Sequence, residues 1–134
     1  MMIVKNLEDV IGTEDHVKGE TWESRRIILK DAGMGFSVHD TIIYKGTESM
    51  FWYKYHQEAV YCVEGEGEIE DLTTGKIHPI KPGTLYALVG HEKHLLRATK
   101  SDMRMVCVFN PPCTGQETHD EEGAYALPKE EANL

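Results

Sequence analysis

Along most of the chain, apolar and polar residues alternate one by one in short runs, and a turn signal interrupts the pattern about every ten residues. Alternation with a period of two places one side of each run in a core and the other in solvent, as in a β-strand. Turn residues such as Thr73-Thr74-Gly75 and Pro82-Gly83 separate the runs. The pattern predicts strands over residues 22–29, 36–44, 50–55, 59–64, 66–72, 76–80, 84–89, 95–99 and 103–109. Many short, evenly spaced strands indicate an all-β barrel or sandwich.

The two ends of the chain depart from this pattern. Residues 6–11 combine a capping Asn6, early acidic residues and apolar positions at helical spacing, which predicts a short N-terminal helix. After Pro111-Pro112 the chain is polar and acidic, which favours a short helix or a flexible lid over another core strand. With neither repeats nor a linker in the sequence, we expect one domain over 1–134, with a barrel core over about 20–110 and a lid over about 113–134.

Composition narrows the class of protein. The chain has 134 residues, with 14 Lys and Arg against 23 Asp and Glu, and its formal net charge is −9. Nucleic acids and anionic membranes attract clustered basic side chains, and the longest basic run here is Arg25-Arg26. The N-terminal residues lack the basic start and long apolar stretch of a signal peptide, and Cys62, Cys107 and Cys113 show no CxxC spacing. We therefore expect a cytoplasmic protein with reduced thiols.

Two segments carry the chemistry. In the first, YHQEAVYCVEGEGE, Glu58 leads into an apolar strand and a glycine-bearing turn. In the second, PGTLYALVGHEKH, Pro82-Gly83 opens a strand that is followed by His94. Their order and spacing resemble the two motifs of the cupin superfamily, a resemblance that implies a small jelly-roll β-barrel whose interior holds one metal ion and one small ligand. The histidine pair that usually precedes the glutamate in the first motif is missing, since Trp52, Tyr53 and Lys54 stand there.

Alternation along residues 54–58 puts His56 and Glu58 on the same face, so that both can point into the barrel. His94 and Tyr86 are the further inward candidates. Three protein ligands that leave positions open are typical of a catalytic metal site. A phenolate is a hard oxygen donor that suits iron, although zinc or another divalent metal could compete. The ordinary alternatives are a solvated carboxylate for Glu58 and a packing side chain for Tyr86.

Longer phrases, among them WESRRIILKDAGMGFSVHDTIIYKGTE and MVCVFNPPCTGQETHDEEGAY, are similar to the ectoine synthase family over nearly the whole chain. This resemblance implies a hydro-lyase that cyclises N-γ-acetyl-L-2,4-diaminobutyrate to ectoine, a compatible solute of osmotic stress, and that forms a homodimer. It implies Fe²⁺ as the cofactor, with Glu58, Tyr86 and His94 as metal ligands. It also implies a substrate pocket formed by Trp22, Arg26, Thr41, Tyr53, His56, Cys107, Phe109, Glu117 and His119.

The reaction suggests a role for most of these residues. An amide carbonyl is a poor electrophile, so a Lewis-acidic metal would stabilise the charge that develops on its oxygen. Aromatic walls from Trp22, Tyr53 and Phe109 would fold the substrate for ring closure. Arg26, with the Thr41 hydroxyl, is the expected partner of the substrate carboxylate. The catalytic candidates for proton transfer are Tyr53, His56, Glu117 and His119, and the sequence leaves the choice of base open.

Alternation also predicts which side chains share a face. Trp22, Ser24 and Arg26 fall on one side of their strand, and a buried Arg26 would need a carboxylate, from the substrate or Glu117. Met105, Cys107 and Phe109 likewise share one face, although Cys107 could be a packed small residue. His16, His39, His78 and His91 show no pattern of partners and are interpreted as solvated or satisfied histidines.

Two other functions remain open from the sequence. One is an iron-dependent cupin oxygenase, which would consume oxygen during turnover. The other is a cupin module that binds a small molecule without converting it.

Overall fold

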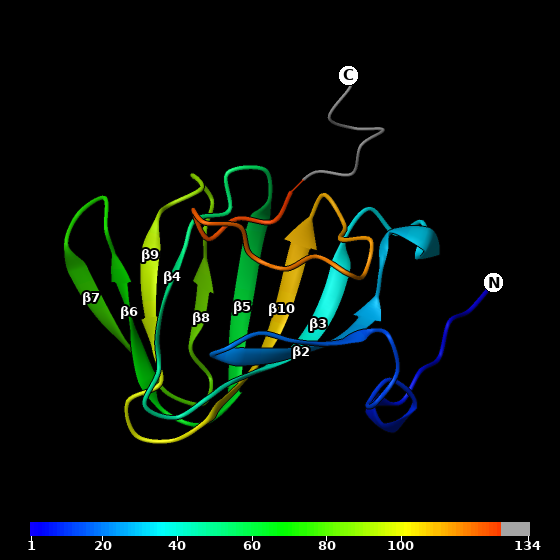
Figure 1. Cartoon of the computed structure of the whole chain (residues 1–134), viewed down its shortest axis with the longest axis horizontal. Helices are drawn as coiled ribbons and strands as arrows, with labels where there is room; N and C mark the ends of the chain where they lie inside the picture. The colour runs from blue at the N-terminus through cyan, green and yellow to red at the C-terminus, as the bar shows by residue number, and fades with distance from the viewer. Residues whose placement is uncertain (127–134) are drawn as a thin grey trace.

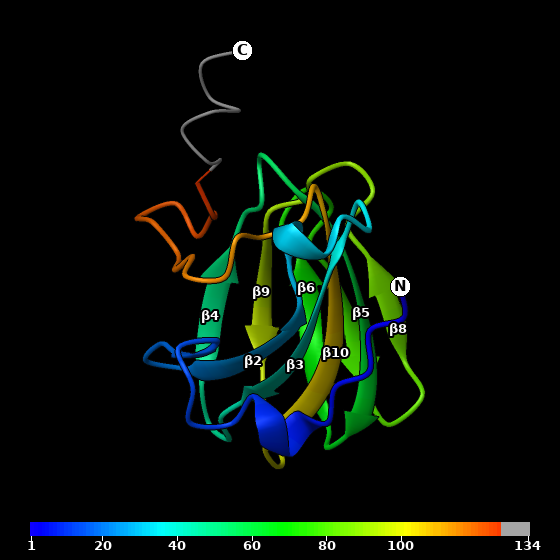
Figure 2. The same cartoon turned by 90° about the vertical axis from the view of Figure 1, so that its right-hand side faces the viewer.

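The computed structural model describes residues 1–126, which form two antiparallel β-sheets facing each other (Figures 1 and 2). The first sheet has the order β1-β2-β3-β10-β5-β8 and the second the order β4-β9-β6-β7. The strands are β1 His16–Lys18, β2 Trp22–Ile28, β3 Ser37–Ile43, β4 Glu48–Phe51, β5 Gln57–Glu64, β6 Gly67–Asp71, β7 Lys76–Ile80, β8 Leu85–Ala87, β9 His94–Arg97 and β10 Met103–Asn110. Two 3₁₀ helices, η1 Leu7–Asp9 and η2 Lys30–Ala32, flank the first sheet.

The core lies between the two sheets and follows the alternation of the strands. On β10, Met103, Met105, Cys107 and Phe109 are buried, while the residues between them are more exposed. β10 pairs with β3 on one side and β5 on the other, so its inward face lies near the middle of the large sheet. Full burial of each large apolar side chain contributes about 1.5–3 kcal/mol to stability, which makes this central strand a main source of the fold's stability.

The outward faces carry ion pairs. Asp40 accepts hydrogen bonds from Arg25 on the neighbouring β2 and from Arg104 on β10. Burial alone would raise the pKa of Asp40, but the hydrogen bonds from Arg104 and Arg25 hold it below its usual value. On the second sheet Arg97 contacts the carboxylates of Glu48, Glu68 and Glu70 at 2.7–2.9 Å. Part of the excess acidic charge is therefore balanced locally on both outer faces.

One end of the barrel is closed by close backbone contacts. Gly65, with a φ of +91°, lies so near the Asp102 carbonyl that an added Cβ would sit 2.0 Å from its oxygen. Gly67 approaches the Arg97 carbonyl in the same way, at 2.1 Å. The turn between β5 and β6 is thus packed directly on the connection between β9 and β10, and no side chain fits between them.

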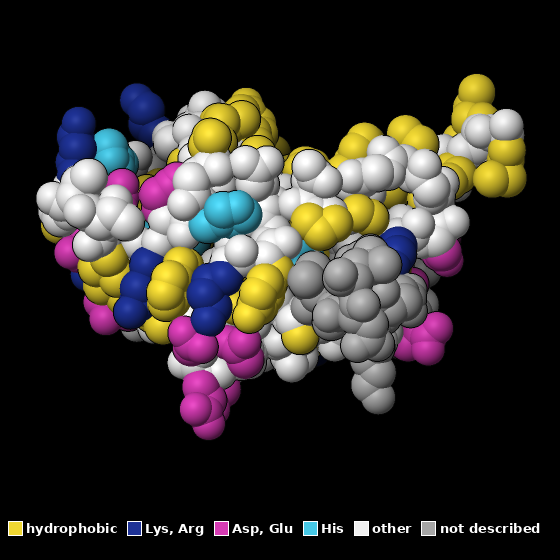
Figure 3. All heavy atoms as spheres, turned by 90° about the horizontal axis from the view of Figure 1, so that it is seen from above, with side chains coloured by type: hydrophobic (Ala, Val, Ile, Leu, Met, Phe, Trp, Pro, Cys, Tyr) yellow, Lys and Arg dark blue, Asp and Glu magenta, His cyan; other side chains and the backbone are white. Residues whose placement is uncertain are grey.

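The chain after β10 crosses the opposite end of the barrel (Figure 1). Its first residues are tied to the large sheet, because Lys30 N donates to Cys113 O at 2.8 Å and Cys113 N donates to the Ser37 hydroxyl at 3.0 Å. Viewed from this end, acidic side chains project from the edges of the face, and basic, histidine and hydrophobic side chains lie between them (Figure 3). The described part of this segment therefore lies over the barrel end opposite the glycine contacts.

The strand prediction holds for the body of the barrel and is wrong in detail at three places. β1 was not predicted; it is a short edge strand that pairs only with β2, so it shows little alternation. The expected strand 50–55 ends at Phe51. The expected N-terminal helix is only the short 3₁₀ helix η1. Asn6 and Asp9 form its capping box, and Gly12, at a φ of +82°, follows it.

At the C-terminal end, residues 111–126 form turns rather than a helix, and residues 127–134 of the expected lid lie outside the described part. Within residues 1–126, no helix has the length and apolar character needed to cross a membrane.

Replacing Gly65 by alanine should destabilise the fold far more than replacing Gly75. Both glycines have a positive φ, +91° and +78°, but an added Cβ at Gly75 meets nothing within 4 Å. Gly75→Ala should therefore show only the conformational cost, about 1 kcal/mol. Gly65→Ala must also push the Asp102 backbone away, and we expect a loss of about 3 kcal/mol or more. Urea unfolding of both variants measures the difference; equal losses would contradict the close-contact argument.

Candidate active site

A small cavity of about 30 Å³ lies between the sheets and is lined in part by the C-terminal segment. Its walls come from strands of both sheets and from that segment. The lining residues are Trp22, Ser24, His39, Thr41, Ile43, Phe51, Tyr53, Glu58, Val60, Tyr86, Leu96, Met105, Cys107, Phe109, His119 and Tyr125. A space of this size holds about one water molecule. It is a mainly aromatic and apolar chamber with a few polar groups, which is the usual character of a small-molecule site.

Glu58 is the carboxyl group of this chamber. It lies near the start of β5, opposite Phe109 in register, and its side chain is buried. Burial raises its pKa to about 8, and a hydrogen bond from the Cys107 thiol lowers it only in part. The Cys107 thiol also contacts the Thr41 side chain, so both residues help to hold the carboxyl group. A carboxyl group in this setting would gain strongly from a nearby cation.

His94 presents a ring nitrogen to the same region. Its Nδ1 lies 3.0 Å from the Glu92 carbonyl, which can only accept, so Nδ1 carries the proton and Nε2 carries the lone pair. Nε2 is buried, and no hydrogen-bond partner for it lies within the described residues. Burial lowers the pKa of His94, so the ring stays neutral. An orphaned, buried lone pair of this kind fits a metal ligand.

Tyr86 completes the possible ligand set. It is paired with Val60 of β5, it lines the cavity together with Glu58, and its ring centroid lies 6.3 Å from that of His94. Burial and the charge of Glu58 raise the pKa of its hydroxyl well above the usual value. No three His, Cys, Asp or Glu side chains in residues 1–126 are grouped to hold a metal ion, so a site here would have to include this phenol. The donor set of carboxylate, phenol and imidazole fits iron.

His119 and Tyr53 form a tight pair in the lining of the same cavity, with the Tyr53 ring 6.2 Å from the His94 ring. The Tyr53 hydroxyl lies 2.6 Å from His119 Nε2. Burial lowers the pKa of His119 to about 3, and the positive charge of Arg26 adds to this. Burial raises the pKa of Tyr53 well above its usual value. Tyr53 therefore keeps its proton and donates it to Nε2, and the neutral His119 ring carries its own proton on Nδ1.

Arg26 is fully buried and joins the barrel to the C-terminal segment. Its Nη1 donates to Gly115 O at 2.9 Å and its Nη2 lies 3.3 Å from the Tyr125 hydroxyl. The Glu117 carboxylate lies 3.8 Å from Nη1, so the carboxylate that the sequence required for this charge is present. Its Nε donates to the Ser24 hydroxyl at 3.2 Å, which fixes the side chain from the barrel side.

Glu117 shapes the segment itself. Its carboxylate accepts hydrogen bonds from Thr114 N at 2.7 Å and Gly115 N at 2.9 Å. Burial would raise the pKa of Glu117, but these backbone hydrogen bonds hold it below its usual value. The Glu117 carboxylate is thus engaged by two backbone N–H groups and lies beside Arg26, which favours a structural role for this residue.

The structure brings together the residues that the sequence singled out. Eight of them line the cavity: Trp22, Thr41, Tyr53, Glu58, Tyr86, Cys107, Phe109 and His119. The other four lie directly behind this wall. Arg26 is 5.9 Å from the Trp22 ring, His56 is 5.9 Å from the Phe109 ring, His94 is beside Tyr86, and Glu117 is beside Arg26. The inward faces expected for β2 and β10 are also as predicted, with Trp22, Ser24 and Met105 in the cavity wall.

Sequence reasoning missed three residues near the site. His39 is buried in the cavity wall, between the Ser24 hydroxyl at 3.3 Å and the Ser37 hydroxyl at 3.1 Å. It shares a face with Thr41, so the alternation that selected Thr41 could have found it. His91, at a φ of +57°, donates from Nδ1 to the carbonyls of Tyr53 and His56, both at 2.9 Å. Tyr125 lies in the acidic segment, where no periodicity marks an inward position.

Comparison with known proteins identifies the family of this chain. A family model described as ectoine synthase matches residues 2–129. The L-ectoine synthase of Halalkalibacterium halodurans is 65% identical over 98% of this chain and 100% of that protein. That of Oceanobacillus iheyensis is 64% identical, over 94% of this chain and 98% of that protein. The chain belongs to the ectoine synthase family.

Solved structures support the same assignment. The crystal structure of ectoine synthase from P. lautus is 61% identical, covers 94% of this chain and 91% of that chain, and superposes with a TM-score of 0.85. A Cupin_2 domain of an XRE family regulator from Enterobacter cloacae, at 17% identity, covers 69% of this chain and 99% of that chain with a TM-score of 0.58. This more distant likeness concerns the fold alone and confirms the cupin-type barrel.

The geometry of the Tyr53–His119 pair can be tested by nitrogen-15 NMR of histidine-labelled protein. The His119 ring should remain neutral from neutral pH down to about pH 5, with the proton on Nδ1, because burial lowers its pKa to about 3. In Tyr53→Phe the donor to Nε2 is lost, and the Nδ1-protonated form should no longer dominate. A charged His119 ring at pH 6 in the unchanged protein, or the same tautomer in both proteins, would contradict this arrangement.

Proposed function

We propose that this chamber carries out the reaction of the ectoine synthase family, the closure of N-γ-acetyl-L-2,4-diaminobutyrate to ectoine with loss of water. The observation that supports it best is that Glu58 and Tyr86 line one cavity with the Tyr53–His119 pair, and that His94 lies beside Tyr86. The α-amine of the substrate attacks its own acetamide carbonyl and forms a six-membered ring. The reaction needs a folded substrate, an activated carbonyl oxygen and a path for one proton.

Glu58, Tyr86 and His94 are proposed to hold Fe²⁺. The buried carboxyl group and the orphaned Nε2 lone pair support this, because both gain from a cation. When bound, the metal would act as a Lewis acid on the acetamide oxygen. The Glu92 carbonyl fixes the tautomer of His94, and the Cys107 thiol contacts the Glu58 carboxyl group. These outer contacts would orient the ligands before the metal arrives.

Arg26 and the aromatic walls are proposed to bind and fold the substrate. The Arg26 guanidinium would bind the substrate carboxylate, which requires the chain around Gly115 and Glu117 to shift, since both now occupy the guanidinium face. Trp22, Tyr53 and Phe109 would limit the substrate to conformations that bring amine and carbonyl together. The cavity of about 30 Å³ is too small for the substrate, so the C-terminal segment must move for entry and would then act as a lid that excludes water.

Proton transfer is assigned to Tyr53 and His119. The α-ammonium group must lose a proton before it attacks. That proton passes to the Tyr53 oxygen while the Tyr53 proton moves to His119 Nε2, which is neutral and already accepts this hydrogen bond. After the attack the ring nitrogen gives up one proton to the former carbonyl oxygen, and the reverse transfer supplies that hydroxyl group with its second proton, so that it leaves as water. His56, buried against Phe109 and Tyr125, would support the ring wall beside them.

We also propose a cytoplasmic location and a homodimeric state for this protein. The net charge of −9 and the buried free thiols of Cys62, Cys107 and Cys113 support work in the cytoplasm of cells under osmotic stress. The cupin resemblance supports a homodimer, and large apolar side chains on the outside, such as Ile77, Leu85 and Val89, provide surface for a second copy to cover.

Replacing Glu58 should abolish the reaction. The protein is reloaded anaerobically with ferrous iron, mixed with N-γ-acetyl-L-2,4-diaminobutyrate and followed by the acetyl methyl signal in proton NMR. Glu58→Ala should reduce turnover about 100-fold or more and lower bound iron, measured by elemental analysis. Glu64→Ala is the matched control, because Glu64 lies on the same strand with an exposed side chain. Turnover by Glu58→Ala at the control rate would refute the metal assignment, and oxygen uptake by the unchanged protein would indicate an oxygenase.

The oligomeric state is tested by light scattering after size-exclusion chromatography. A homodimer should give about twice the chain mass of 15.2 kDa. A single copy over a tenfold range of protein concentration would reject the dimer without affecting the assignment of the site.

A further inference from the structure

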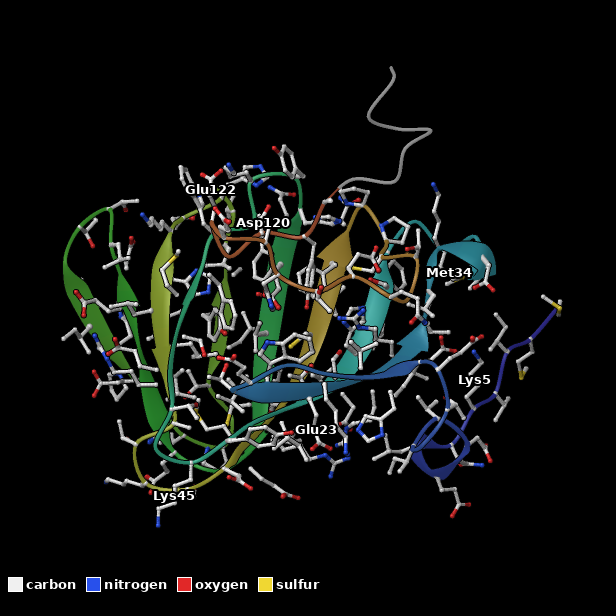
Figure 4. The ribbon with its side chains drawn as sticks, in the orientation of Figure 1. Lys5, Glu23, Met34, Lys45, Asp120 and Glu122 are labelled. Atoms are coloured by element: carbon white, nitrogen blue, oxygen red, sulfur yellow. The ribbon has the colours of Figure 1, made fainter. Side chains whose placement is uncertain are left out.

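The end of the described chain folds into a tight turn built by Asp120. Its Oδ1 accepts hydrogen bonds from Glu122 N at 2.8 Å and Ala124 N at 3.1 Å. The backbone closes the same turn, with Gly123 N donating to Asp120 O at 3.0 Å and Asp120 N donating to Ala124 O at 2.9 Å. Figure 4 labels Asp120 and Glu122 at the end of the barrel crossed by this segment. The turn is thus ordered by its own hydrogen bonds.

Gly123 fastens this turn to the barrel. Trp52 N donates to Gly123 O at 2.9 Å, just after β4 ends. The φ of Gly123 is +79°, and an added Cβ would lie 2.5 Å from Met50 O. Any other residue would be strained and would collide with the backbone of β4. The turn therefore has a specific seat on β4.

Tyr125 follows this turn directly and enters the chamber. It is only 3% exposed, and its ring lies 4.5 Å from that of His119, nearly parallel at 27°. The Tyr53 and Phe109 rings lie at 5.1 and 5.3 Å. The Arg26 guanidinium carbon lies 5.4 Å from the Tyr125 ring, and its Nη2 reaches the hydroxyl at 3.3 Å. One side chain thus contacts both the group assigned to the substrate carboxylate and the group assigned to proton transfer.

We propose that Tyr125 is a positioning residue of the reaction, which holds the Arg26 guanidinium through its hydroxyl and the His119 ring through its face. This inference rests on the proposed function, because it takes the roles of Arg26 and His119 from there. The physical reason is preorganisation. The Tyr125 hydroxyl gives the planar guanidinium of Arg26 a third hydrogen-bond partner beside Ser24 and Gly115. The His119 ring can swing away from the Tyr53 hydroxyl unless a neighbouring ring blocks it. Because Tyr125 follows the seat of Gly123, correct docking of the turn brings both groups into place together.

The two contacts of Tyr125 can be separated by two variants. Tyr125→Phe keeps the ring and loses only the hydroxyl, so it should raise KM about tenfold through Arg26 and leave kcat nearly unchanged. Tyr125→Leu also loses the stacked ring, so in this variant kcat should fall ten- to hundredfold through His119. A residue that only fills space would give unchanged kinetics in Tyr125→Phe.

Two further variants test whether the contact between Gly123 and β4 positions Tyr125. Gly123→Ala leaves every aromatic side chain unchanged but displaces the turn, and it should reproduce the kinetic loss of Tyr125→Leu. Glu121→Gln, at an exposed position of the same turn, is the matched control and should behave like the unchanged protein. Bound iron and the urea midpoint are measured for each variant, so that loss of metal or of folding is separated from loss of position.

A readout without turnover separates this inference from the proposed function. In the nitrogen-15 spectrum of His119, Tyr125→Leu should shift the balance between the two neutral tautomers, and Tyr125→Phe should not. If the unchanged protein makes no cyclic product, the proposed function fails, and this spectrum alone decides whether Tyr125 positions His119. Unchanged kinetics and an unchanged spectrum in both Tyr125 variants would overturn the inference, as would losses that only follow the fraction of unfolded protein.

Discussion

A carboxyl group buried between two sheets is the constraint on which the rest of this structure depends. Burial raises the pKa of Glu58 to about 8, and the one hydrogen bond that opposes this shift comes from a neutral thiol, Cys107. Such a group is costly unless a cation or a proton accompanies it. The Nε2 of His94, which has no hydrogen-bond partner in the described residues, and the phenol of Tyr86 lie nearby. The interior of the barrel therefore combines apolar packing with a group of buried polar atoms.

The second constraint is a buried positive charge behind the cavity wall, beside Trp22 and Tyr125. Arg26 is fully buried, and its partners at Gly115, Glu117 and Tyr125 all come from the segment that crosses the barrel end. The guanidinium can therefore make these hydrogen bonds and this ion pair only when that segment is folded in place. Burial also lowers the pKa of His119, a residue of this segment, to about 3, so its ring is neutral at neutral pH. The same segment thus lines the chamber and contributes to the charge states inside it.

On the outer faces of the two sheets, charged side chains form ion pairs between neighbouring strands. Asp40 is bridged by two arginines and Arg97 contacts three glutamates, so opposite charges pair between neighbouring strands. The Arg97 pairs are partly exposed and screened by water, whereas the Arg25–Asp40 pair is buried. They help to fix the strand register while leaving the interior charges to the chamber. The strongly shifted pKa values of buried groups such as Glu58 and His119 mark the chamber as the functional part of the molecule.

The sequence by itself determined the features that follow from a repeating local pattern, namely the strands and their inward faces. A period of two predicted the strands of both sheets and the inward faces of Trp22, Arg26, Cys107 and Phe109, because alternation is a property of a single extended strand. The resemblance to the ectoine synthase family predicted the residues that meet in the chamber. Only the tertiary structure decided which groups pair across the barrel. The tautomers of His94 and His119, the clamp of His91 on two carbonyls and the insertion of Tyr125 depend on segments far apart in the chain. The C-terminal segment has no periodic pattern, since its position is set by single hydrogen bonds and one glycine contact rather than by a repeating face.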